Sequence, residues 1–270
     1  MLWNAVNQQV PVGKTEMSYV SFGHGEKVLA VLPGLSDGLT TVKGKALLLA
    51  PPYKRFLDRY TIYMFSRKNE MPQGYSIRDM AEDQAIALRT LGISKLSVMG
   101  VSEGGMIAQY LAINHADLVE KLVIAVSAPR ANANVQECVG RWIDYAKQGD
   151  HQRLMIDTAE RSYSDKYLKK YRTMYPLLGK LGTPRSYNRF LVNAHAILCF
   201  DASNELGKIS CPTLIVGGAE DRIVGVGASY ELNQSIANSE LHVYDGLGHA
   251  AYEEADDFYD RVFQFLDLTS

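Results

Sequence analysis

One serine in this sequence stands where it could act as a nucleophile. Ser102 lies between Gly100 and Gly104 in the segment GVSEGG, with an apolar run before it and a helical pattern after it. A sharp turn from a strand into a helix strains its central residue, and small neighbours relieve the crowding. Such a turn presents the hydroxyl at a helix N-terminus, which favours negative charge. We expect Ser102 to be a nucleophile; the alternative is a packing turn in which its hydroxyl only caps the helix.

A serine hydroxyl needs a base to attack a carbonyl carbon, and the base in turn needs an orienting acid. Of the six histidines, His249 is the best placed, because it follows the apolar segment ELHVY in the loop DGLGH. His195 could also face a pocket, although a structural role is expected for it. Asp221 follows another predicted strand, 28 positions before His249, and Glu220 beside it is the competing carboxylate. The predicted catalytic set is therefore Ser102, Asp221 and His249, in this chain order.

Predicted strands and helices alternate along most of the chain and would position these residues. The apolar runs that read as strands are 27–32, 61–65, 95–99, 121–126, 212–217 and 240–244. Helical spacing is clear over 77–91, where Ser76 is a predicted N-cap and Asp79 completes a capping box. Strands separated by helices of this length imply crossover connections and a mostly parallel sheet. The predicted fold class is α/β.

The alternation of strands and helices stops in the middle of the chain. Residues 130–208 carry helical patterns rich in Tyr, Arg and Lys, without a convincing strand. We expect residues 1–129 and 209–270 to form one α/β core, and 130–208 to form a helical cap over the carboxyl ends of the strands, where such sheets hold ligands. The alternative is a helical appendage that only stabilises the fold.

Composition narrows the class of protein. A length of 270 residues suits one α/β domain with an insert, and a net charge of -2 does not favour nucleic acid or an anionic membrane as a partner. The three cysteines are widely spaced, as is typical of free thiols in a reducing compartment. No segment resembles a signal peptide or a membrane span. We expect a cytoplasmic protein that needs no cofactor and no metal and binds a small molecule; its oligomeric state stays open.

Four motifs, in this order, resemble those of the α/β-hydrolase superfamily. They are LPGL at 32–35, GVSEGG at 100–105, GGAEDRIV at 217–224 and GLGHAAYEE at 246–254. The resemblance covers nearly the whole chain and implies the α/β-hydrolase fold, a mostly parallel central sheet flanked by helices, with an all-helical cap inserted after the sixth strand. It also implies that Ser102 is the nucleophile, His249 the general base and then acid, and Asp221 the residue that orients His249.

The same resemblance implies an oxyanion hole formed by two backbone N–H groups, those of Leu35 and Glu103. Many relatives begin the first of these loops with His-Gly, where this chain has Pro33-Gly34; the change leaves the main-chain donor in place. Glu103 stands where relatives often have Met or Gln. We expect a neighbouring polar residue to hold its carboxylate; the alternative is that the carboxylate disfavours anionic acyl groups.

A serine at position 102 implies acyl transfer through a serine ester. Haloalkane dehalogenases and epoxide hydrolases of this family need an aspartate there instead. The leading interpretation is a serine hydrolase acting on a small carboxylic ester or a related acyl compound. An acyltransferase, perhydrolase, thioesterase or carbon–carbon bond hydrolase would use the same triad. An alternative from another class is a slow-turnover, ligand-binding signalling protein of the same fold.

Overall fold

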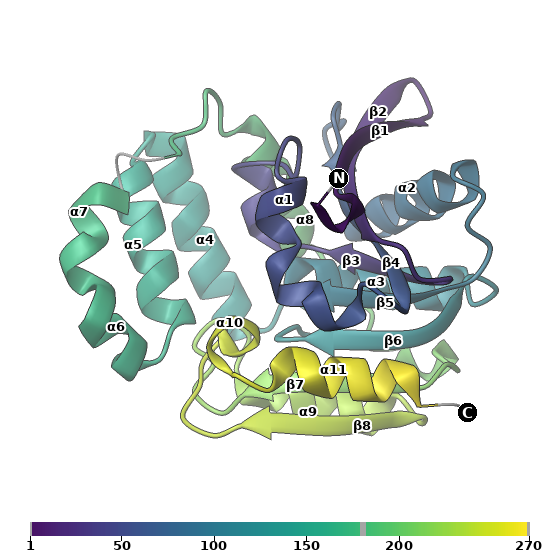
Figure 1. Cartoon of the computed structure of the whole chain (residues 1–270). Coiled ribbons are helices and arrows are strands. Elements are labelled where there is room, and N and C mark those ends of the chain that lie inside the picture. Colours follow the sequence, from purple (N-terminus) through teal and green to yellow (C-terminus); the bar gives the residue numbers. More distant parts are fainter. Residues whose placement is uncertain (1, 179–181, 269–270) are drawn as a thin grey trace.

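An eight-stranded sheet forms the centre of the protein (Figure 1). The computed structural model describes residues 2–178 and 182–268. The strand order across the sheet is β1-β2-β4-β3-β5-β6-β7-β8. The strands are β1 (Val6–Val12), β2 (Thr15–Gly23), β3 (Lys27–Leu32), β4 (Tyr60–Lys68), β5 (Leu96–Val101), β6 (Val119–Ala125), β7 (Thr213–Gly218) and β8 (Ser239–Tyr244).

The sheet is mostly parallel, as predicted. The ladders from β4 through β8 are parallel, and only the β1–β2 and β2–β4 pairs are antiparallel. The sequence prediction missed β1 and β2. In β1 only Val10 and Val12 are buried, so this edge strand carries too little apolar pattern to be recognised. The strand expected at 95–99 continues to Val101, which brings its end directly against Ser102.

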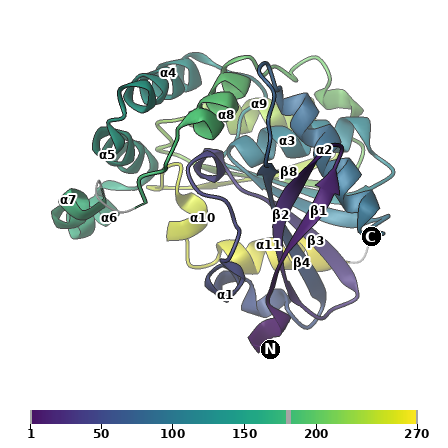
Figure 2. The same cartoon turned by 90° about the horizontal axis from the view of Figure 1, so that it is seen from above.

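Helices cover both faces of the sheet (Figure 2). One face packs against α2 (Ile77–Thr90), α3 (Glu103–Asn114) and α9 (Val226–Ser235), and the other against α1 (Ala46–Leu49), η3 (Pro51–Phe56) and α11 (Phe258–Asp267). Short helices η1 (Leu2–Asn4), η2 (Leu35–Gly38) and α10 (Ala251–Glu254) complete this part. Leu122 and Ile124 of β6 enter one core cluster and Val123 the other, which is the alternation expected of a central strand. The predicted capping box of Ser76 and Asp79 at the start of α2 is confirmed.

Between β6 and β7, the described residues form a series of helices. They are α4 (Ala133–Gln148), α5 (His151–Ser162), α6 (Asp165–Tyr171), η4 (Arg172–Met174), α7 (Tyr175–Leu178), α8 (Asn188–Leu198) and η5 (Leu206–Lys208). Figures 1 and 2 show α5, α6 and α7 at one end of the molecule, whereas α8 packs against η2 and α2. Within the described ranges, none of the helices combines the length and apolar character needed to cross a membrane.

Gly104 permits a close approach between α3 and β3. A Cβ atom at this position would lie 1.9 Å from the carbonyl oxygen of Leu32, whereas at Gly140 in α4 nothing lies within 4 Å. Backbone contacts of this kind cannot give way without moving the helix. Because Gly104 has no side chain, the start of α3 can contact the end of β3.

We predict opposite effects of adding a methyl group at these two glycines. Gly104→Ala should lower the free energy of unfolding by at least about 2 kcal/mol, because the helix must shift. Gly140→Ala, in an open helical position, should raise it by about 0.5–1 kcal/mol. Urea denaturation of the two variants and the wild type measures both effects. Wild-type stability of Gly104→Ala would contradict the close packing of α3 on β3.

Candidate active site

The chain reverses direction at Ser102, between the end of β5 and the start of α3. The backbone of Ser102 has φ 54° and ψ −117°, a conformation that residues with a side chain rarely adopt. Its N–H donates to the carbonyl oxygen of Ala125 at 2.9 Å. Its carbonyl oxygen accepts from the N–H of Gly105 at 2.9 Å and from the hydroxyl of Ser127 at 2.8 Å. Hydrogen bonds on both sides therefore hold this strained turn.

The hydroxyl of Ser102 does not cap the helix. Ser102 occupies the N-cap position of α3, yet its side chain makes no capping hydrogen bond. Its Oγ lies 2.9 Å from Nε2 of His249, and Nδ1 of the same ring lies 2.8 Å from Oδ2 of Asp221. Asp221 and His249 are each 7% exposed. The structure thus brings the three predicted residues into one hydrogen-bonded line.

The sheet topology explains why these three residues meet. Ser102 follows β5, Asp221 follows β7, and His249 follows β8 in the loop before α10. These strands are parallel and lie within four consecutive positions of the sheet, so their carboxyl ends share one edge. Glu220, the competing acid, is exposed and makes no hydrogen bond to the described residues through its carboxylate.

Asp221 has two kinds of hydrogen-bond donor. Its Oδ1 accepts from the N–H groups of Ile223 at 2.8 Å and Val224 at 2.9 Å, while Oδ2 faces His249. Burial by itself raises the pKa of Asp221, but the charge and hydrogen bond of His249, together with these N–H groups, outweigh burial and leave the pKa below its usual value. An ionised carboxylate only accepts hydrogen bonds. Nδ1 of His249 must then carry the proton, which leaves the Nε2 lone pair for Ser102.

Two backbone N–H groups lie close to Ser102. Leu35 begins η2 directly after Gly34, and a Cβ atom at Gly34 would lie 3.3 Å from Cβ of Ser102. Glu103 is the first residue of α3. Within residues 2–178 and 182–268, the N–H groups of Leu35 and Glu103 have no hydrogen-bond acceptor. Unpaired donors beside a nucleophile are what the stabilisation of an oxyanion requires.

Glu103 is held by an arginine that the sequence did not single out. Its carboxylate accepts from Nη2 of Arg67 at 2.8 Å, and both side chains are 0% exposed. Burial raises the pKa of Glu103, and the charge and hydrogen bond of Arg67 oppose this rise. The prediction that a neighbouring polar residue holds Glu103 is confirmed. Arg67 lies 36 positions away at the end of β4, so no local pattern could have indicated the pair.

Two insert segments contact the loops of the site. At the end of α5, the carbonyl oxygen of Ser162 accepts from the N–H of Ala250, next to His249, at 2.8 Å. On α8, Nη2 of Arg189 lies 2.8 Å from Oδ2 of Asp37 in η2. The loop that carries His249 and the η2 segment that begins at Leu35 are thereby each tied to a helix of the insert.

His195 lines a cavity that Ser102, Asp221 and His249 do not border. It lines a cavity of about 730 Å³ between α8 and the loop that precedes α2, together with Met71, Tyr75, Leu191 and Val192. The three residues of the hydrogen-bonded line lie outside its lining.

In the part of the chain that the structure describes, no group of three or more His, Cys, Asp or Glu side chains could hold a metal ion.

The fold is that of the α/β hydrolases. The chain matches the family described as alpha/beta hydrolase fold over residues 63–256, and it belongs to that family. It is an α/β-hydrolase enzyme.

The chain is similar to known proteins in sequence and in fold. The chain is 28% identical over 203 residues to the AB hydrolase superfamily protein YisY of Bacillus subtilis, covering 72% of this chain and 74% of that protein. The crystal structure of MGS-M2, an alpha/beta hydrolase enzyme from a Medee basin deep-sea metagenome library, has a TM-score of 0.87 and 19% identity, over 97% of this chain and 98% of that one. The enol-lactonase from Burkholderia xenovorans LB400 has a TM-score of 0.82 and 22% identity, over 97% of this chain and 100% of that one.

We predict that the strained turn can be detected by removing the side chain. Ser102→Gly and Ser102→Ala both lack the hydroxyl, but only glycine adopts the observed φ and ψ without strain. Ser102→Gly should therefore be more stable than Ser102→Ala by about 1 kcal/mol. Urea denaturation of the two variants measures the difference. Equal stabilities, or a more stable alanine variant, would show that the turn is relaxed.

A second prediction concerns the acid dependence of stability. The pKa of Asp221 is lower in the folded protein than its unfolded value of about 3.9. The contribution of ionised Asp221 to the free energy of unfolding is therefore present above the unfolded pKa and is lost as the pH falls through the folded pKa. The stability difference between wild type and Asp221→Asn should shrink as the pH is lowered from about 6 to about 3. Denaturant unfolding at each pH tests this, and a pH-independent difference would be the contrary result.

Proposed function

We propose that this enzyme is a serine hydrolase that cleaves a small carboxylic ester, or a related acyl compound, through an acyl-enzyme on Ser102. The observation that carries the proposal is the line from Ser102 Oγ to His249 Nε2 and from His249 Nδ1 to Asp221 Oδ2, at 2.9 and 2.8 Å. A hydroxyl, a base and an orienting acid in this order are the parts that nucleophilic acyl transfer needs.

The first half of the proposed reaction forms the acyl-enzyme. Ser102 Oγ attacks the carbonyl carbon of the ester while its proton moves to Nε2 of His249. The carbonyl oxygen becomes an anion and accepts hydrogen bonds from the N–H groups of Leu35 and Glu103. Asp221 stabilises the imidazolium ion through Nδ1. As the C–O bond breaks, Nε2 returns the proton to the departing alcohol.

The second half repeats these steps with water. His249 removes a proton from the water as its oxygen attacks the acyl carbon, and the same N–H groups hold the second oxyanion. Breakage of the bond to Ser102 Oγ releases the carboxylic acid, and Nε2 returns the proton to the serine. No group outside the chain, the ester and water is required for the balance of atoms and charge.

The insert acts as a cap in this proposal. The described parts of residues 1–129 and 209–270 form the core that holds the catalytic groups, and the described parts of residues 130–208 bound the space above Ser102. The contacts of Ser162 with Ala250 and of Arg189 with Asp37 support this role. The free state of Cys138, Cys199 and Cys211 supports a cytoplasmic location.

Burst kinetics test the proposed function. With p-nitrophenyl esters of increasing acyl length, the wild type should release a burst of one nitrophenol per enzyme before steady turnover. Ser102→Ala should lose the burst and about a million-fold in turnover. Asp221→Asn should lose about ten-thousand-fold, because His249 is no longer held in the required tautomer. A lactone in the same panel tests whether the enzyme also cleaves a cyclic ester.

Ser210→Ala is the matched control, because it removes an exposed serine hydroxyl at the opposite edge of the sheet, before β7. It should behave as the wild type does. Retention of turnover by Ser102→Ala would refute the acyl-enzyme. Near-full activity of Asp221→Asn would refute the assigned acid and leave Glu220 as the one to test.

A further inference from the structure

A buried arginine joins the two turns that carry the candidate oxyanion donors. Nη2 of Arg67 donates to the carboxylate of Glu103 at 2.8 Å and to the carbonyl oxygen of Pro33 at 2.7 Å. Pro33 lies two residues before Leu35, and Glu103 directly follows Ser102. A single guanidinium nitrogen therefore spans from one side of the proposed oxyanion hole to the other.

The same unit is fastened to the insert. Oδ2 of Asp37 accepts from the backbone N–H of Arg67 at 3.0 Å and from Nη2 of Arg189 at 2.8 Å. Arg189 also donates to the carbonyl oxygens of Arg67 at 2.7 Å and of Lys68 at 2.7 Å. Since Arg189 belongs to α8, this one side chain connects the insert to both η2 and the end of β4.

The charges of this unit balance. Arg67 and Arg189 supply two positive charges, and Glu103 and Asp37 supply two negative ones. Ion pairs that are fully removed from water contribute little net stability compared with apolar residues of the same size. Their advantage is geometric, because a planar guanidinium fixes the direction of each hydrogen bond it donates. Stability alone thus gives no reason for a charged pair beside Ser102.

We propose that Arg67 is a positioning residue that sets the spacing between the N–H groups of Leu35 and Glu103, and that Arg189 couples the placement of α8 to the same unit through Asp37. This inference rests on the proposed function. Oxyanion donors are effective within about 2.7–3.1 Å of the developing negative oxygen, so a small displacement weakens them. Because the oxyanion exists only in the transition state, loss of the spacing lowers kcat and leaves KM nearly unchanged.

The test removes the charged pair as a whole. The double variant Arg67→Met/Glu103→Met leaves no unpaired charge in the core and keeps the backbone N–H of residue 103. We expect it to fold, with kcat for the p-nitrophenyl ester reduced about ten- to a hundred-fold, less than the loss of a whole donor. KM should change by no more than about two-fold. Urea denaturation checks that the variant is folded.

An arylboronic acid gives a readout that a purely structural role would not move. It forms a tetrahedral adduct with a serine nucleophile and so resembles the transition state. Its inhibition constant should rise by about the same factor as kcat falls. Arg67→Lys keeps a positive charge for Glu103 but not the planar guanidinium, and should recover part of the lost kcat.

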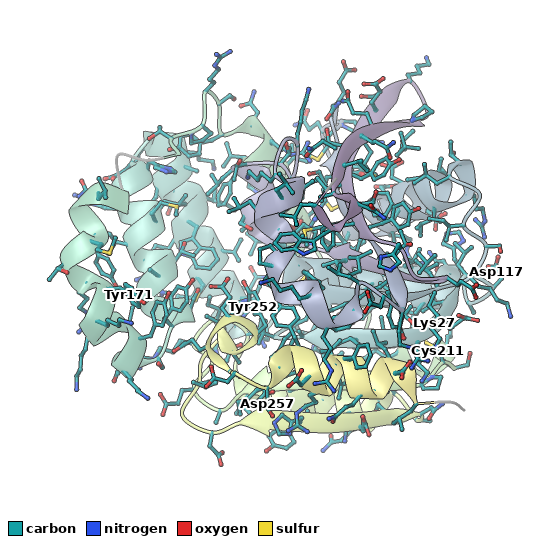
Figure 3. All side chains as sticks on the ribbon, in the orientation of Figure 1. Lys27, Asp117, Tyr171, Cys211, Tyr252 and Asp257 are labelled. Carbon is teal, nitrogen blue, oxygen red and sulfur yellow. The ribbon has the colours of Figure 1, made fainter. Side chains whose placement is uncertain are left out.

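The control variant is Arg89→Met/Asp117→Asn. It removes an exposed pair of the same kind, with 2.9 Å between Arg89 Nη2 and Asp117 Oδ2. Figure 3 shows Asp117 on the side of the molecule opposite Tyr171 of the insert. Its kcat, KM and boronate affinity should equal those of the wild type.

A double-mutant cycle tests the link to α8. Asp37→Asn/Arg189→Met should also lower kcat, and combining it with Arg67→Met/Glu103→Met should cost less than the product of the separate effects, because both pairs act on the same two N–H groups. Multiplicative effects would refute the coupling through Asp37. An unchanged kcat and boronate affinity in a folded Arg67→Met/Glu103→Met would refute the positioning role while the wild-type burst still supports the proposed function. Absence of turnover in the wild type would overturn the proposed function and this inference together.

Discussion

The site depends on the reversal of the chain within a single residue, Ser102. A strand ends on one side of it and a helix begins on the other, so its backbone takes a positive φ that costs about 1–3 kcal/mol. The cost is offset by hydrogen bonds to both of its backbone groups and by the approach of α3 to β3, which Gly104 makes possible. The result is a hydroxyl that points away from the helix it could have capped and toward His249.

Two buried carboxylates beside this turn are held in different ways. Asp221 is surrounded by donors and by His249, and its pKa lies below its usual value; burial raises the pKa of Glu103, which is paired with Arg67. When the pKa values of two carboxyl groups in one active site are shifted in opposite directions, the two groups commonly have different roles. In the proposed function, Asp221 acts through His249. Glu103 acts through its backbone N–H group, whose position is fixed by the pairing of its side chain.

Short-range patterns were sufficient to predict much of this structure. The capping box of Ser76 and Asp79 and the glycines around Ser102 are local signals, and the alternation of strands and helices predicted the parallel part of the sheet. Strand β1 escaped prediction because its exposed polar residues give no apolar period. The pairing of Arg67 with Glu103 was not predicted, because the local sequence of a strand does not indicate that a charged residue has its partner on a distant helix. Contacts of that range become visible only once the fold is known.

The most direct test of a nucleophile activated by His249 is the rate at which a fluorophosphonate labels the protein, with the modified peptide identified by mass spectrometry. We expect a single label on Ser102 in the wild type. In His249→Ala, which lacks the base, labelling should be about a hundred- to ten-thousand-fold slower. A label on another serine, or equal rates in the two proteins, would contradict a nucleophile activated by His249.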